Sequence, residues 1–175
     1  MKTEVRIAGT GGMGVVLAGV VLAHAAVIHG GLEAVQTQSY GSEARGTSAK
    51  SEVVISDRPI KYPKVLKADY SILMSQKAFD MHISEAKEGS TVLVDPDLVD
   101  YRAYANRFDI VPVAAMRIAD ELGNRMMSNM VMLGAFSKRS GVVSVELLEK
   151  ALRDMVPEKT FPLNSQAVRA GADAV

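Results

Sequence analysis

Apolar residues in the first third of the chain predict a strand, a helix and a second strand. Residues 5–8 form a short apolar run that ends in a glycine-rich turn. Residues 14–28 are almost continuously Val, Leu and Ala, as in a helix that packs on a sheet, and Gly30 and Gly31 would end that helix. Residues 33–38 follow as the second strand. This order predicts that the two strands are parallel and adjacent.

Strand-like and helix-like segments continue to alternate along the rest of the chain. Further strands are predicted at residues 51–56, 70–75, 91–94 and 109–113, with residues 60–63 as a short hairpin arm and 39–48 as a loop. Helices are predicted at residues 76–87, 115–122, 128–138, 145–155 and 164–171, and Ser144 is expected to cap the fourth of them. No repeat or long linker interrupts the pattern, so residues 1–175 are predicted to form a single domain. The alternation predicts an α/β fold, a three-layer Rossmann-like domain with a mostly parallel sheet and a small hairpin element.

Composition and charge narrow the classes of function. Hydrophobic residues make up 48% of the chain and charged residues 23%, which is typical of a globular protein. Twenty basic and twenty acidic side chains cancel, so the charge indicates neither a nucleic-acid nor a membrane partner. The apolar segment at residues 15–28 is shorter than the roughly 20 residues that a bilayer span needs. A buried helix and a cytoplasmic location are therefore expected.

The residues available for metal or redox chemistry are few. The chain has no cysteine, which excludes disulfides, thiolate-bound iron–sulfur clusters and thiol nucleophiles from this chain alone. His24, His29 and His82 show no recognisable metal-binding spacing, so no metal site is predicted. His24 lies inside the apolar helix and is expected to be a packed core residue. Redox chemistry would require an organic cofactor or a partner chain.

The first glycine turn matches the pattern Gly-x-Gly-x-x-Gly through Gly9, Gly11 and Gly14, with Gly12 between them. Such a turn permits a tight bend, removes a Cβ that would block a phosphate, and lets the strand and helix approach closely. Backbone N–H groups and the helix dipole favour an anion at that end of the helix. The pattern is compatible with two interpretations, an anion or nucleotide contact and a purely structural close turn.

The second strand argues against a nicotinamide dinucleotide. A dinucleotide-binding fold places an acidic residue at the end of this strand to hold the ribose hydroxyls. Here residues 35–39 read Val-Gln-Thr-Gln-Ser, without a carboxylate, and Glu33 precedes the strand instead of ending it. An independent NAD dehydrogenase is therefore not favoured.

A second glycine-punctuated turn follows the second strand and contains Tyr40, Glu43 and Arg45. Arg45 is the best single candidate for binding a phosphate or carboxylate, because a guanidinium can bind such groups bidentately. The loop is expected to leave the carboxyl end of its strand, where open α/β sheets bind ligands. Two alternatives stay open, a surface pair between Arg45 and Glu43 and insertion of the loop into a partner subunit.

Taken together, these motifs resemble the gamma subunit, or gamma domain, of the 2-oxoacid:ferredoxin oxidoreductases. The sequence Gln-Thr-Gln-Ser-Tyr-Gly-x-Glu-x-Arg-Gly at residues 36–46 is most similar to the 2-oxoglutarate and branched-chain 2-oxoacid enzymes. The resemblance covers almost the whole chain, at residues 9–15, 36–46, 51–56, 60–63, 69–76, 129–134, 141–145 and 164–171.

The resemblance implies a subunit of an enzyme that converts a 2-oxoacid, coenzyme A and oxidised ferredoxin to an acyl-CoA, CO2 and reduced ferredoxin. It implies alpha-, beta- and delta-type partner subunits, which would bind thiamine diphosphate, Mg²⁺ and iron–sulfur clusters of the 4Fe–4S type. This chain would then supply no catalytic residue, would support assembly, and would be inactive in isolation. The candidates for contacts with coenzyme A or with other subunits are Gly9, Gly11, Gly12, Gly14, Tyr40, Glu43 and Arg45.

Two residues depart from the family pattern. Met13 stands where the family usually has Gln, which removes a hydrogen-bonding side chain from the first loop. Thr47 stands where a further Gly is common, which restricts the backbone of the second loop. Two other functions stay open at this point, an independent nucleotide-dependent oxidoreductase and a structural scaffold subunit whose glycine loops bind no ligand.

Overall fold

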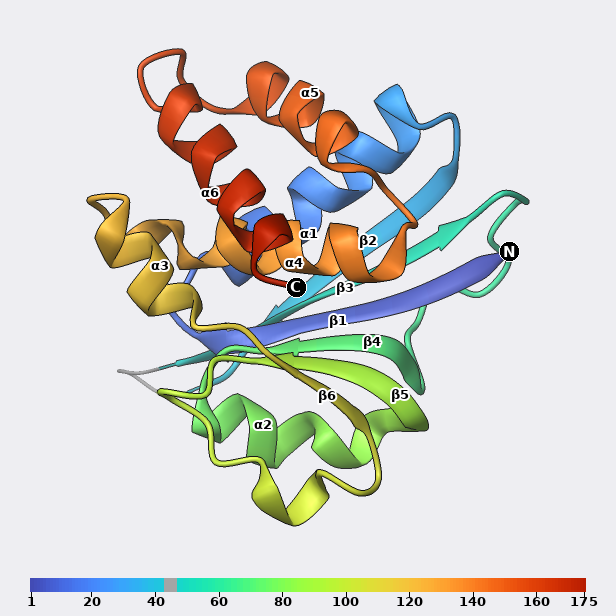
Figure 1. Ribbon diagram of the computed structural model, residues 1–175. Helices are drawn as coiled ribbons and strands as arrows, with labels where there is room; N and C mark the ends of the chain where they lie inside the picture. Colours follow the sequence, from blue (N-terminus) through green and yellow to red (C-terminus); the bar gives the residue numbers. More distant parts are fainter. Residues whose placement is uncertain (43–46) are drawn as a thin grey trace.

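A computed structural model gives the fold and describes residues 1–42 and 47–175. A six-stranded sheet crosses the described part of the chain in the order β2-β3-β1-β4-β5-β6 (Figure 1). β3 runs antiparallel to its neighbours β2 and β1, whereas β1, β4, β5 and β6 are parallel to one another. The strands are β1 (Lys2–Thr10), β2 (Glu33–Tyr40), β3 (Ser48–Ser56), β4 (Ala68–Leu73), β5 (Ala86–Val94) and β6 (Asp109–Pro112).

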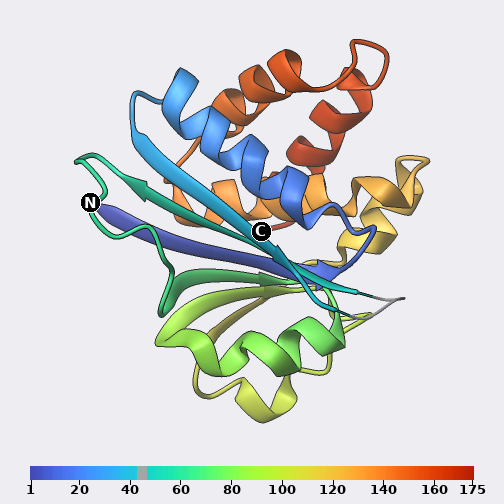
Figure 2. The ribbon, with the colours of Figure 1, turned by 180° about the vertical axis from the view of Figure 1, so that it is seen from behind.

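Helices cover both faces of the sheet, so the predicted three-layer α/β architecture with a mostly parallel sheet is confirmed (Figures 1 and 2). The first face carries α1 (Val15–His24), α3 (Ala115–Glu121), α4 (Ser128–Ser140), α5 (Val145–Met155) and α6 (Phe161–Asp173). The second face carries α2 (Gln76–His82). Short helical turns are η1 (Ala25–His29), η2 (Ile83–Glu85), η3 (Arg102–Tyr104) and η4 (Arg125–Met127). No helix in residues 1–42 and 47–175 is both long and apolar enough to span a bilayer.

The main core lies between the sheet and the helices of the first face. Val5 of β1, Val53 of β3 and Met130 of α4 are fully buried there. Helix α4 is buried along most of its length, because α6 packs closely on it. A Cβ added at Gly134 would lie only 1.9 Å from the carbonyl oxygen of Val168, so glycine is required where α4 and α6 meet.

The expected pairing of the first two strands is wrong. β3 lies between β1 and β2 and pairs with both of them, from Thr10↔Ser48 on one side to Tyr40↔Ala49 on the other. β2 and β1 still run in the same direction, because each is antiparallel to β3. The physical reason is the connection after Tyr40, which returns the chain as a hairpin and inserts β3 beside β1. The hairpin element is therefore β2–β3, and residues 60–63 form no strand.

Two local expectations about helices also need correction. The helix predicted at residues 76–87 ends earlier, with α2 at His82 and η2 at Glu85, and β5 begins at Ala86. His24 is not a core residue, since its side chain is 29% exposed and contacts Asp154 of α5. By contrast, the predicted cap of α5 is confirmed, because the Ser144 hydroxyl accepts a hydrogen bond from the N–H of Leu147.

Candidate functional site: the glycine turn after β1

The first glycine turn connects β1 to α1 and depends on glycine at several positions. Gly12 and Gly14 have φ angles of +89° and +72°, which residues with a side chain rarely adopt. Gly9 lies under the turn, where an added Cβ would be 3.0 Å from the Met13 sulfur and 3.1 Å from Cγ1 of Val15. The tight bend and the close strand–helix approach predicted from the sequence are therefore present.

Asn129 of α4 fixes the end of this turn. Its side-chain amide donates a hydrogen bond to the Gly14 carbonyl at 3.1 Å, and its side-chain oxygen accepts one from the N–H of Met130 at 2.8 Å. The residue is only 4% exposed. A Cβ at Gly14 would lie 2.3 Å from the Asn129 amide nitrogen, so the position of the Asn129 side chain requires glycine at position 14. The sequence shows Asn129 ahead of an apolar helix but gives no sign of this partner, which lies 115 residues away.

The two departures from the family pattern take part in the same turn. The Met13 sulfur accepts a weak hydrogen bond from the N–H of Thr10 at 3.4 Å, so this side chain still closes the loop. The Thr47 carbonyl accepts a hydrogen bond from the N–H of Gly11 at 2.6 Å. This bond joins the first turn to the residue that follows the second one. The Gly11 N–H is consequently already used within the chain.

The start of α1 supplies donors for an anion. The first intrahelical bond of α1 runs from the N–H of Ala18 to the Gly14 carbonyl at 3.1 Å. The N–H groups of residues 15–17 precede it and have no hydrogen-bond acceptor among the described residues. An open groove of about 270 Å³ lies at this point, lined by the turn, the first residues of α1, and Tyr40. The helix dipole adds partial positive charge at the same end.

Tyr40, the first residue of the second turn, lies beside the first turn. It is 62% exposed and lines the glycine groove. It also lines a second hollow of about 220 Å³, which includes Lys50, Met81 and His82. Burial, followed by the nearby charge of Arg6, lowers the pKa of His82 from its ordinary value of 6.5. The imidazole of His82 is therefore neutral near pH 7, and Lys50 is the basic side chain among the described residues that line that hollow.

The remaining predicted site residues are distributed differently. Gly11, Gly12, Gly14 and Tyr40 line the glycine groove, whereas Gly9 is packed beneath the turn. Glu43 and Arg45 lie outside the described residues. Three larger hollows, of about 430, 510 and 370 Å³, lie elsewhere: beside the C-terminal end of α4, after β5, and beside Arg6.

The sheet order bears directly on the dinucleotide interpretation. In a dinucleotide fold, the ribose-binding residue ends the strand that neighbours β1. Here the neighbour on that side is the antiparallel β3, and β2 is one strand further out. β2 is therefore not the neighbour of β1, and its carboxyl end does not occupy the position of the ribose-binding residue. This arrangement agrees with the missing carboxylate in residues 35–39.

Comparisons with known proteins agree with the motifs. Residues 4–174 match the family model described as pyruvate ferredoxin/flavodoxin oxidoreductase. The chain is 45% identical to the 2-oxoglutarate synthase subunit KorC of Methanocaldococcus jannaschii, over 98% of this chain and 92% of that protein. It is 31% identical to the ketoisovalerate oxidoreductase subunit VorA of Methanothermobacter marburgensis, over 98% of this chain and 36% of that protein.

Solved structures show the same fold. The gamma subunit of a keto/oxoacid ferredoxin oxidoreductase from Geobacter sulfurreducens superposes with a TM-score of 0.87 at 36% identity, over 99% of this chain and 96% of that chain. The 2-oxoglutarate:ferredoxin oxidoreductase of Magnetococcus marinus, solved with 2-oxoglutarate, coenzyme A and succinyl-CoA bound, has a TM-score of 0.87 at 24% identity, over 99% of this chain and 31% of that chain. The resemblance to gamma subunits of 2-oxoacid:ferredoxin oxidoreductases is therefore confirmed. This chain belongs to the pyruvate ferredoxin/flavodoxin oxidoreductase family.

Proposed function

We propose that this chain is the non-catalytic gamma subunit of a cytoplasmic 2-oxoglutarate:ferredoxin oxidoreductase. The reaction would convert 2-oxoglutarate, coenzyme A and oxidised ferredoxin to succinyl-CoA, CO2 and reduced ferredoxin. The higher identity to a 2-oxoglutarate synthase subunit (45%) than to a ketoisovalerate enzyme (31%) supports this substrate. The independent nucleotide-dependent enzyme is not supported, because β3 separates the two strands that would hold a dinucleotide.

The cofactors of the reaction would be bound by alpha-, beta- and delta-type partner subunits. The chain contains no cysteine, so it offers no thiolate for a 4Fe–4S cluster. Thiamine diphosphate and Mg²⁺ would likewise be held by other subunits. What this chain offers is a pre-formed turn with backbone donors, together with exposed apolar side chains such as Leu17 and Tyr40 beside it. These features suit contacts with a ligand and a neighbouring subunit.

The glycine groove is the proposed contact point for coenzyme A. The observation that carries this proposal is that residues 15–17, whose N–H groups have no acceptor among the described residues, line a groove shared with Tyr40. Phosphates are the natural ligands of such a helix start. The volume of about 270 Å³ is below the roughly 300–1,000 Å³ of a complete small-molecule site. We therefore expect the groove to hold only a phosphate-bearing part of coenzyme A, with a partner subunit enclosing the rest.

Two measurements on the complex test this proposal. Affinity purification of the tagged chain should recover subunits that carry thiamine diphosphate and iron–sulfur clusters, and their absence would contradict the subunit assignment. In the intact complex, Arg45→Ala should raise the KM for coenzyme A about tenfold or more, as expected for one lost hydrogen bond to a charged group. The KM for 2-oxoglutarate should change little.

The matched control is Arg58→Ala. Arg58 is exposed and follows β3, at the opposite end of the sheet from the glycine turn. It should leave both KM values at their wild-type level. If Arg45→Ala assembles normally and also keeps a wild-type KM for coenzyme A, the ligand contact is wrong and the scaffold function is favoured. The subunit assignment and the contact with coenzyme A can therefore be contradicted independently.

A further inference from the structure

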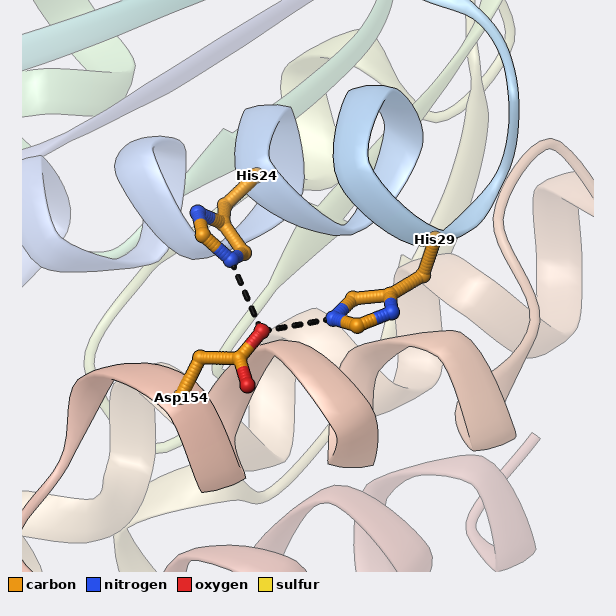
Figure 3. Close-up of side chains that lie close together, drawn as sticks. All are labelled: His24, His29 and Asp154. Carbon is orange, nitrogen blue, oxygen red and sulfur yellow. Dashed lines mark hydrogen bonds and ion pairs between the residues drawn. The ribbon is translucent and has the colours of Figure 1, made fainter.

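His24 of α1 and His29 of η1 both contact the carboxylate of Asp154 in α5 (Figure 3). Nε2 of His24 lies 3.0 Å from Oδ2 of Asp154, and Nε2 of His29 lies 2.6 Å from the same oxygen. One ligating atom from each residue can be chosen so that all three lie within 4.8 Å of one another. This cluster belongs neither to the glycine turn nor to the groove that it lines.

The backbone of the helix explains why the two histidines converge. His24 ends α1, and His29 ends η1, which is a π-helical turn. In a regular α-helix, residues five apart differ in direction by about 140°. The i→i+5 bonds of a π-helix place such residues on one side, and short π segments occur frequently at functional sites. The five-residue spacing of His24 and His29 therefore differs from the spacing of metal-binding histidines on an α-helix.

The donor set is that of a transition-metal site. Two imidazole nitrogens and one carboxylate oxygen match the three-ligand zinc sites that keep a fourth position open for water. Imidazole does not suit Mg²⁺ or Ca²⁺, which prefer oxygen ligands. Within residues 1–42 and 47–175, no Lys or Arg pairs with Asp154, so its charge is available to a cation.

The geometry needs little adjustment to accept a metal ion. Metal–ligand bonds of about 2.0–2.1 Å in a tetrahedron place the ligand atoms about 3.3 Å apart. The two nitrogen–oxygen distances are 3.0 and 2.6 Å, so they would have to open by roughly 0.3 and 0.7 Å to reach that separation. The side chains of His24, His29 and Asp154 are 29%, 22% and 44% exposed. Each is therefore anchored on a helix yet reachable by an ion from solvent.

We propose that His24, His29 and Asp154 form a binding site for a divalent transition metal of the zinc class. The ion would replace the two hydrogen bonds to Asp154 and join α1 and η1 to α5, with solvent at its fourth position. The site is structural in effect, because it connects two packed helices and lies apart from the glycine groove. The proposal does not depend on the reaction that the complex catalyses.

Titration of the full chain with Co²⁺ and Zn²⁺ tests the site. The affinity tag must be removed and the protein treated with a chelator first, because a histidine tag would bind both ions. We expect a visible Co²⁺ absorption that saturates at one ion per chain, and its displacement by Zn²⁺. His24→Ala, His29→Ala and Asp154→Asn should each weaken Zn²⁺ binding more than tenfold. Zn²⁺ should raise the melting temperature of the wild type and not that of the variants.

Glu158→Gln serves as the control, since Glu158 is an exposed carboxylate just beyond α5. This variant should bind Zn²⁺ as the wild type does. Asp154→Asn keeps the shape of the side chain and an oxygen that can accept the histidine hydrogen bonds, and melting in metal-free buffer verifies that each variant is folded. If the folded Asp154→Asn binds Zn²⁺ as tightly as the wild type, or if the wild type gives no Co²⁺ absorption, the three residues form only a hydrogen-bonded cluster.

Discussion

The contact between Gly14 and Asn129 gives the sharpest test of how the glycine turn is held. Replacing Gly14 by Ala forces a side chain into a φ of +72°, which costs about 1–2 kcal/mol. The new Cβ would also lie 2.3 Å from the Asn129 amide nitrogen and displace it from the Gly14 carbonyl. That hydrogen bond contributes about 0.5–1.5 kcal/mol. We expect Gly14→Ala to lower the free energy of unfolding by about 1.5–3.5 kcal/mol, the sum of these costs.

Gly12→Ala separates the two costs. Gly12 has a φ of +89°, but an added Cβ would meet nothing within 4 Å. The free energy of unfolding of this variant should therefore fall only by the cost of the positive φ angle, about 1–2 kcal/mol. In an Asn129→Ala background the clash at Gly14 also disappears, because the nearest remaining atom, the Cβ of residue 129, lies 3.4 Å away. Gly14→Ala should then cost about 1 kcal/mol less than it does in the wild type.

Urea unfolding followed by far-UV circular dichroism measures these differences. The wild type, Gly14→Ala, Asn129→Ala and the double variant form a double-mutant cycle, with Gly12→Ala beside it. Additivity within about 0.3–0.5 kcal/mol would show that the two sites are independent. Additivity of that kind, or equal costs at Gly12 and Gly14, would refute the proposed fit between Gly14 and Asn129.

Three further predictions concern packing and charge. Gly134→Ala places a Cβ 1.9 Å from the Val168 oxygen and should cost about 1–3 kcal/mol in urea unfolding, whereas a gain of stability would contradict the close approach of α4 and α6. Arg6→Met removes a 1%-exposed guanidinium that lies 2.6 Å from Glu52, and should lower the free energy of unfolding by about 3 kcal/mol. Adding Glu52→Gln should recover part of this loss, and no recovery would refute the pairing. Burial lowers the pKa of His82, so stability should be fully present above pH 6.5, its ordinary value, and fall as the pH drops through the lower folded pKa. His82→Asn should flatten this fall, as measured by unfolding at several pH values, and an unchanged slope would show that His82 is not its source.

Local signals in the sequence were sufficient for much of the fold. Gly31 has a φ of +68° just beyond η1, as expected for a glycine after a helix. Ser144 caps α5 through its hydroxyl, and α5 spans the predicted residues 145–155. Each of these features depends on neighbours a few residues away. A single sequence therefore contains the information needed to place them.

Features that depend on distant residues could not be predicted in the same way. The insertion of β3 between β1 and β2 depends on a pairing register over nine residues of β1, and no local pattern distinguishes it from an adjacent parallel pair. The approach of His24 to His29 depends on a π-helical turn, whose apolar sequence Ala-Ala-Val-Ile is equally suited to an α-helix. In the sequence, Asn129 is an ordinary polar residue at the start of a helix. Its role depends on the packing of α4, which places its side chain against the Gly14 carbonyl.

The hydrogen bonds of the turn change what its glycine pattern can mean. In a dinucleotide fold, the second glycine lets the backbone approach the pyrophosphate. Here the N–H of Gly11 is already bonded to the Thr47 carbonyl, and the Gly14 carbonyl is held by Asn129. The turn is thus fixed from two sides by the chain itself, so a ligand need not order it. The N–H groups of residues 15–17, beside the exposed Tyr40, have no acceptor among the described residues and are donors that an anion could use. The turn therefore keeps the glycine spacing of a dinucleotide site, but its Gly11 N–H is not free for a pyrophosphate.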